Sequence, residues 1–289
     1  MSSPHAERRP PSTTVRLFDP RLASNRFVIV AFCGVLAVVF TVDAAGAGTA
    51  SEAAAAALRA AFSVFLAWAI ARELDPDRPV AASVAAVLAL PILLSGEPRL
   101  GAVVAVLFAV RILAGTTGRA PTVLDLLWLP GVAAYGATSP GGVVAGLALA
   151  GALAVGGTAP GGRRRAALAA AIVAAGAVVA VGFASATIGP DPESPTAAQW
   201  GLMGLAALAA TAALLRVAIP TSPCDLSGEP LSRVRVRNAR LLAVAVGVLT
   251  LVWLGGAGIP ALVGLWAAVI GVGMTQVLVS SPSGGGAER

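Results

Sequence analysis

Charged residues cluster where the second of ten apolar runs ends. Three acids and two arginines fall within the seven residues Arg72-Glu73-Leu74-Asp75-Pro76-Asp77-Arg78. Asp75 and Asp77 flank a proline, and their carboxylates could jointly hold a Mg²⁺ ion or accept hydrogen bonds from a polar head group. A tight, solvated turn closed by its own salt bridges explains the same residues without a ligand. The sequence leaves both interpretations open.

A second polar segment follows Arg111, which lies in the apolar run 100–116. The string Gly115-Thr116-Thr117-Gly118-Arg119 places two glycines around two threonines before a helix start, and could form a concavity that binds an anion. Asp125 has two explanations. Thr122 and Asp125 have the spacing of a helix capping box, and Asp125 is also expected at the depth of Arg111, with which it could pair.

Two further charges lie near the other ends of the apolar runs. Asp43 ends the first run, and Arg59 lies about two turns into the second. An ionisable group at membrane depth is costly and marks a candidate site by default. Here a structural ion pair, or an aspartate that reaches water, is the favoured explanation.

The inner charges form the predicted substrate-binding set, because they gather at the same ends of three apolar runs. The set consists of Arg72, Asp75, Asp77, Arg111, Arg119 and Asp125. The sequence predicts no catalytic residue, no metal ligand set and no cofactor.

Several absences narrow the chemistry. All 20 cationic residues are arginine, so a lysine Schiff base and a Walker-type phosphate loop are excluded. The single histidine, His5, lies in a polar tail, which argues against a histidine base or a His-ligated metal. Cys33 and Cys224 lie in different runs and loops and predict neither a disulfide framework nor a zinc site.

The elements that must position these residues are transmembrane helices. The chain is 57% hydrophobic and 12% charged, with a mean hydropathy of +0.86, whereas soluble domains carry about 25% charged residues. We therefore predict an all-α, polytopic transmembrane helix bundle of about ten spans, or nine if one short run is re-entrant. The runs are 27–45, 53–72, 79–95, 100–116, 122–137, 140–158, 165–186, 198–219, 239–255 and 258–279.

Arginine placement predicts the orientation of these spans. With both termini in the cytoplasm, almost all loop arginines face inward, and only Arg99 faces outward with four acids. The predicted domains are a disordered basic tail at 1–26, a single membrane domain at 27–279 and a short disordered tail at 280–289. Topology explains the arginines within 220–240, and a basic stretch lying on anionic lipid is the alternative. The composition predicts the plasma membrane of a bacterium with a G+C-rich genome.

Two outlines resemble known families without matching their motifs. Ten spans in a chain of this length resemble the drug/metabolite transporter superfamily, which would imply two inverted halves of five spans, but residues 27–137 and 140–279 share no convincing residue match. Asp75-Pro76-Asp77-Arg78-Pro79 resembles the acidic loop of UbiA-type membrane prenyltransferases. That family's asparagine and second acidic motif are missing, so no family is assigned.

Function is predicted in three classes. The leading prediction is a small transporter or lipid flippase with a polar site on the cytoplasmic side, where arginines attract an anionic small molecule or lipid head group. The alternatives are a membrane-embedded Mg²⁺-dependent enzyme acting on a phosphate-bearing lipid, and a non-catalytic subunit of a larger assembly. The sequence leans against an enzyme, because no nucleophile or general base accompanies the acids. Membrane lipid is the predicted partner, nucleic acid is not, and the sequence names no protein partner.

Overall fold

The structure is a computed structural model, and it describes Ser12 and residues 20–46, 49–158, 163–187, 194–216 and 219–279. These described residues form α-helices, joined by loops, and contain no β-strand beyond one isolated bridge between Pro223 and Pro230. The protein is therefore all-helical, as the sequence predicts.

The helices follow the apolar runs closely. Their bounds are α1 Ala23–Ala45, α2 Ala50–Leu74, α3 Pro79–Leu93, α4 Leu100–Ala114, α5 Val123–Gly136, α6 Gly142–Gly156, α7 Arg164–Ala184, α8 Ala197–Leu215, α9 Arg233–Leu254, α10 Gly258–Ala261 and α11 Val263–Val279. Two differences stand out. Helix α9 begins six residues before the predicted run, and the last run is divided into α10 and α11. The predicted tails at 1–26 and 280–289 lie largely outside the described residues.

Local sequence signals set several helix starts. Thr49, Thr122 and Thr196 each form a capping box with the residue three positions later, which satisfies backbone N–H groups that no helical carbonyl can reach. Pro79 occupies the first turn of α3, where a proline's missing N–H costs nothing. Gly115 ends α4 in the left-handed conformation that favours glycine.

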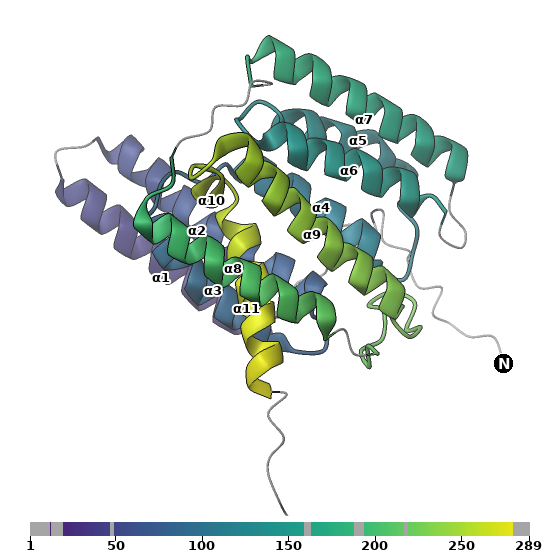
Figure 1. Ribbon diagram of the computed structural model, residues 1–289, viewed down its shortest axis with the longest axis horizontal. Coiled ribbons are helices and arrows are strands. Elements are labelled where there is room, and N and C mark those ends of the chain that lie inside the picture. Colours follow the sequence, from purple (N-terminus) through teal and green to yellow (C-terminus); the bar gives the residue numbers. More distant parts are fainter. Residues whose placement is uncertain are drawn as a thin grey trace, which may run out of the picture.

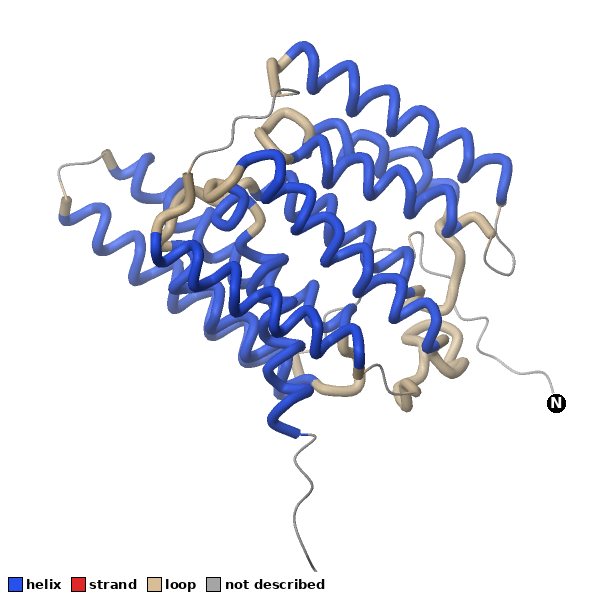
Figure 2. The backbone as a smooth tube through the Cα atoms, in the orientation of Figure 1, coloured by secondary structure: helices blue, strands red, loops and turns tan. Residues whose placement is uncertain are grey.

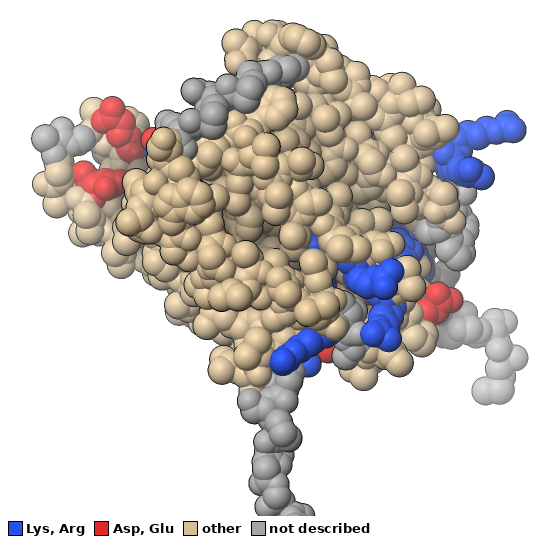
Figure 3. Space-filling model, in the orientation of Figure 1, with Lys and Arg blue, Asp and Glu red and all other residues tan. Residues whose placement is uncertain are grey.

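Consecutive helices run in alternating directions, so the loops collect at two ends of the bundle (Figure 2). We call the end where α1, α3, α5, α7 and α9 begin the basic end, because most of the loop arginines lie there; the other is the opposite end. Contacts between distant loops support this division, since Thr221 bonds Asp77 at the basic end and Arg99 bonds Ala261 at the opposite end. Figure 3 shows blue side chains toward one end and red ones at the far tip of α1 and α2.

Helices α2, α4 and α11 form the middle of the bundle. Helix α2 packs against α1, α3, α4 and α11, while α4 also packs against α5, α6 and α9. Helices α5, α6 and α7 form a layer on one side of α4 and α9 (Figure 1). Helix α1 packs on α2 and α3 and leaves most of its apolar surface exposed.

The exposed apolar surface is compatible with an integral membrane protein. Helices α1, α2, α7, α8 and α9 are long and apolar enough to cross a membrane, and α3, α4, α5, α6 and α11 are shorter but also apolar. Large apolar side chains such as Val30, Leu127 and Leu208 are more than two-thirds exposed on the bundle surface. Such a surface needs lipid around it.

Small residues let the helices approach closely. A Cβ atom added at Gly273 of α11 would lie 2.3 Å from the backbone oxygen of Ala209 on α8. One added at Gly146 of α6 would lie 2.7 Å from the oxygen of Ala133 on α5. Close backbone contact of this kind holds membrane helices together where lipid provides no hydrophobic drive to associate.

Candidate functional site

A buried ion pair joins α2 to α4 at the basic end. Arg111 Nε donates to Glu73 Oε1 at 2.8 Å, and the Thr116 hydroxyl donates to the other carboxylate oxygen. The Glu73 side chain is fully buried. The predicted substrate-binding set does not include Glu73, although Glu73 lies in the same charged segment as Asp75 and Asp77. The need of Arg111 for an acid at its own depth is the signal that could have identified it.

Asp75 faces α9 from the end of α2. Arg240 places Nη2 at 3.6 Å from Asp75 Oδ1 and donates through Nε to the Leu74 oxygen and through Nη1 to the Ala213 oxygen, both at 2.7 Å. Arg78 Nη1 lies 3.4 Å from Asp75 Oδ2. Burial raises the pKa of Asp75, and the two arginines oppose that shift. Arg240 therefore caps the last turns of α2 and α8 while it balances the carboxylate.

Asp77 holds a long loop through hydrogen bonds from the loop backbone. The backbone N–H groups of Thr221 and Ser222 donate to its carboxylate at 3.1 and 2.8 Å. Burial alone would raise the pKa of Asp77, but the hydrogen bonds from Ser222 and Thr221 outweigh it and lower the pKa. We call residues 219–232 the capping loop.

The capping loop fills the concavity that the sequence predicted as an anion site. The Asp225 N–H donates to the Thr116 oxygen at 2.9 Å, and the Leu226 N–H donates to the Thr117 oxygen at 3.2 Å. Gly118, at φ 73°, lies so close that an added Cβ atom would meet Ser227 Oγ at 2.0 Å. The protein's own loop therefore occupies this face of the α4–α5 turn.

Arg235 caps the end of α4 from the first turn of α9. Its Nε donates to the Leu113 oxygen at 3.1 Å and its Nη2 to the Ile112 oxygen at 2.9 Å. The sequence predicted that the arginines within 220–240 lie in a cytoplasmic loop, where they either set the membrane topology or lie on anionic lipid. Arg235 and Arg240 turn into the protein instead, whereas Arg233 and Arg237 are exposed.

The remaining predicted residues are Asp125, Arg72 and Arg119. Asp125 completes the capping box with Thr122, as one of its two explanations predicts, and accepts a hydrogen bond from the Ser12 hydroxyl. Arg72 lies 5.7 Å from the centre of the Trp68 ring. Arg119 is half-buried in the α4–α5 turn.

Taken together, these contacts join the ends of α2, α4 and α8 to α9 and to the loop that precedes it. We call the Glu73–Arg111–Thr116 group, the Asp75–Arg240 group and the capping loop the basic-end seal. Asp75 and Asp77 point to different partners, and within the described ranges no group of three or more His, Cys, Asp or Glu residues could hold a metal ion. Whether the six predicted residues bind a substrate stays a prediction.

The opposite end is open. A cavity of about 490 Å³, which we call the large cavity, lies there among loop 94–99, the start of α8 and the segment around α10. Its polar lining comes from Ser95, Glu97, Arg99, Thr187 and Gln199. A small cavity of about 270 Å³ adjoins it, lined by Arg59, Pro98, Arg99, Leu100, Gly101, Tyr135, Thr138 and Ser139. Arg99 lines both cavities.

The turn and short helix between α9 and α11 line the large cavity. Gly255 has φ 58° and ψ −133°, a conformation that glycine adopts readily and other residues do not, so α9 ends there. The short helix α10 follows, and its Ala261 oxygen accepts from the Arg99 N–H at 3.1 Å. Trp266 Nε1 donates to the Gly258 oxygen at 3.2 Å and fixes the start of α11.

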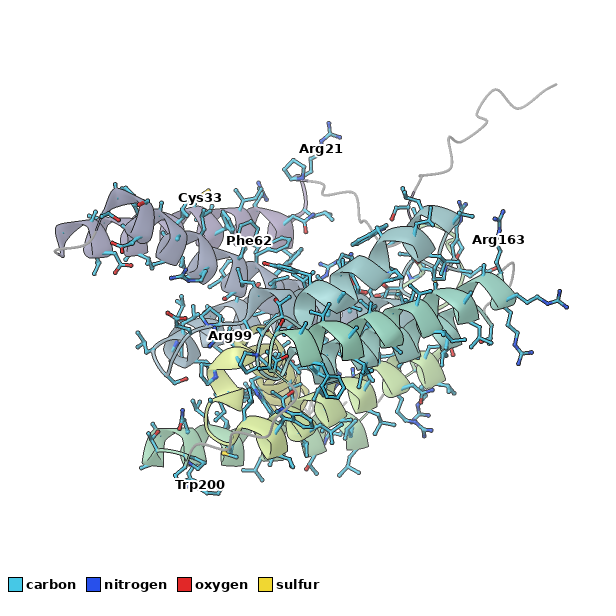
Figure 4. The ribbon with its side chains drawn as sticks, turned by 90° about the horizontal axis from the view of Figure 1, so that it is seen from above. Arg21, Cys33, Phe62, Arg99, Arg163 and Trp200 are labelled. Carbon is cyan, nitrogen blue, oxygen red and sulfur yellow. The ribbon has the colours of Figure 1, made fainter. Side chains whose placement is uncertain are left out.

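Short helices recess both cavities. Helices α3, α4 and α6 have 15 residues each, which corresponds to about 22 Å, less than the ~30 Å of a bilayer core. Helix α2 has 25 residues and projects with α1 well beyond the level of Arg99 (Figure 4). Of the three runs that form these helices, the sequence marks only 79–95 as short, and it predicts no cavity between their loops.

Compared with known protein families, curated proteins and solved structures, the chain gives no significant match. Its own geometry must therefore carry any functional conclusion.

Proposed function

We propose that this protein is a membrane carrier for a small polar solute, described here in a state open at the opposite end and closed at the basic end. The observation that carries the proposal is the contrast between the two ends. A polar cavity of about 490 Å³ opens at one of them, while at the other, among the described residues, charged side chains and the capping loop bind one another and neighbouring helices. Carriers alternate between two such states around a central path.

The predicted substrate set has a place in this proposal. Arg72, Asp75, Asp77, Arg111, Arg119 and Asp125 lie in or beside the basic-end seal, and they would become available to a solute when the seal opens. The concentration of arginine at this end favours the cytoplasm as its side of the membrane. Ion pairs that break and re-form suit a two-state element better than a rigid apolar core does.

The two alternatives have less support. A Mg²⁺-dependent enzyme would need Asp75 and Asp77 to converge, and they bind Arg240 and the capping loop respectively. A non-catalytic subunit would explain the exposed apolar faces, but lipid explains them equally well. Neither alternative accounts for a polar cavity beside a helix break.

Cysteine labelling at both ends tests the proposal. Cys224 is buried in the capping loop, with Sγ 3.8 Å from the Gly115 oxygen, and Ser95 lines the large cavity. In a Cys33→Ser background, Cys224 labelling by a membrane-impermeant maleimide reports the basic end, and a separate Ser95→Cys, Cys224→Ser variant reports the opposite end. Glu73→Gln weakens the seal, so a carrier should show faster labelling of Cys224 and slower labelling at position 95.

A rigid protein gives a different result, because loosening one end leaves the other unchanged. Faster labelling of Cys224 with an unaltered rate at position 95, seen in both Glu73→Gln and Asp77→Ala, would overturn the proposal. Arg233→Gln is the matched control, since Arg233 is exposed at the same end. Its two labelling rates should equal those of the parent.

A further inference from the structure

Two arginines share the small cavity without an acid among its lining residues. Arg59 reaches it from the middle of α2 and Arg99 from the residue before α4. The hydroxyls of Thr138 and Ser139 also line it, but they donate to the Tyr135 and Gly136 oxygens at 2.8 and 3.1 Å. The charge facing this cavity is therefore positive.

Within the described part of the chain, neither guanidinium is firmly neutralised by a carboxylate. Among the described residues, no ion pair joins Arg59 to Asp43, the acid that sequence reasoning offered as its partner. Glu52 instead accepts from the Thr49 N–H and hydroxyl, each at 2.8 Å. Arg99 lies 3.9 Å from Glu97, and both side chains are substantially exposed. An exposed pair at this distance contributes little to stability, so a competing anion can replace it.

The position of Arg59 makes its charge accessible from the small cavity. It lies nine residues after the start of α2, or roughly 13 Å along the helix axis, beside Arg99 in the cavity lining, and it is exposed. An anion that enters the small cavity can therefore reach this guanidinium and neutralise it.

Size and geometry favour an oxyanion. A guanidinium presents parallel N–H donors that match the two oxygens of a phosphate or carboxylate group. The volume of about 270 Å³ accepts such a group. The rest of a larger solute could extend past Arg99 into the large cavity, because Arg99 lines both.

We propose that the small cavity binds the phosphate or carboxylate group of a ligand between the guanidinium groups of Arg59 and Arg99. That this site binds the substrate of a carrier rests on the proposed function. That it binds an anion does not. A soluble solute and the phosphate of an anionic lipid share the required chemistry, and the test must separate them.

Thermal unfolding in maltoside micelles provides the test, because this detergent contains no phosphate or carboxylate. Inorganic phosphate is titrated against chloride of equal ionic strength, and phosphatidylglycerol is added in a second arm. A ligand that binds the folded protein raises its melting temperature. We expect phosphate to raise that of the parent protein, with at least a tenfold weaker apparent affinity in Arg59→Gln and Arg99→Gln and no change in Arg163→Gln.

Each outcome decides the inference. A shift with phosphate identifies a soluble anion, and a shift with phosphatidylglycerol alone identifies a lipid head group, provided that Arg59→Gln abolishes either one. No shift in both arms, or an equal shift in Arg59→Gln and Arg99→Gln, overturns the anion site. If anions do not bind, but Glu73→Gln still speeds labelling of Cys224 and slows labelling at position 95, the carrier proposal holds without this site. If anions bind, but the two labelling rates do not change in opposite directions, the site holds and the carrier proposal is wrong.

Discussion

Arg111 Nε lies 2.8 Å from Oε1 of a fully buried Glu73, and this pair fastens α2 to α4 at the basic end. Breaking a buried pair by removing one partner leaves an uncompensated charge, which costs about 3–5 kcal/mol. We expect Glu73→Gln and Arg111→Gln each to lower the free energy of unfolding by roughly 3 kcal/mol. The double variant should lose clearly less free energy of unfolding than the sum of the losses in the two single variants.

Unfolding in a series of mixed micelles measures this coupling. Glu97→Gln is the matched control, because Glu97 is exposed and its partner lies at 3.9 Å. Additive single effects would show that the two side chains do not act as a pair.

Asp77 should make the capping loop sensitive to acid. Its folded-state pKa is lowered by hydrogen bonds from the loop, so its contribution to stability is present above the ordinary aspartate pKa of about 3.9. That contribution is lost as pH falls through the lowered folded value. Pepsin digestion between pH 2 and pH 5 should show increasing cleavage within 219–232 at the acid limit.

The Asp77→Asn variant should lose this dependence, since an amide does not titrate in that range. Cleavage that rises equally with acid in both proteins would assign the effect to another group. Asp75 is not that group, because burial raises its pKa. The folded protein then binds that proton more tightly, and the contribution of Asp75 falls as pH rises through the raised value.

Gly115→Ala should destabilise the basic end. Gly115 has φ 65°, and an added Cβ atom would lie 2.3 Å from Arg235 Cζ, so the substitution strains the backbone and displaces the arginine that caps α4. The left-handed conformation alone costs about 1–2 kcal/mol. Gly34→Ala is the comparison, because an added Cβ atom there meets nothing within 4 Å. It should leave the melting temperature unchanged or raise it, and equal losses would contradict this account.

Gly255→Ala should reshape the large cavity. An alanine cannot adopt φ 58° and ψ −133° without strain, so the turn between α9 and α10 must shift. We expect at least a threefold change in maleimide labelling of Ser95→Cys, while that of Cys224 at the other end stays constant when measured in the same membranes. An unaltered rate at position 95 would show that Gly255 does not control the cavity.

The sequence predicted the helices well because apolar runs of this length have few alternatives in a membrane. The starts of α3 and α4 agree to the residue, and the capping box at Thr122 was readable from two side chains. The sequence did not predict the start of α9, because four arginines within 233–240 are typical of a solvated loop. In the structure, Arg235 and Arg240 instead donate to carbonyl groups at the ends of other helices.

The partners of the charges were beyond the reach of sequence reasoning. Arg111 could be placed at the depth of several acids, and only the packing of α2 on α4 selects Glu73. The opposite-end cavities depend on how far the short helices are recessed beside α2, which no pattern within a single run encodes. Arg59 was visible as a deep charge, but its proximity to Arg99 is a product of tertiary packing.

The caps on α2 and α4 come from far along the chain, since Arg240 and Leu74 are separated by 166 positions and Arg235 and Ile112 by 123. At about 5–20 residues per second of translation, Leu74 waits roughly ten to thirty seconds before its partner is synthesised. During biogenesis the first helices therefore enter the bilayer with exposed carbonyl ends and an unlocked Asp75. The last third of the nascent chain therefore completes helices of its first half, and a chain whose synthesis ends before Arg235 would have early helices that lack these caps.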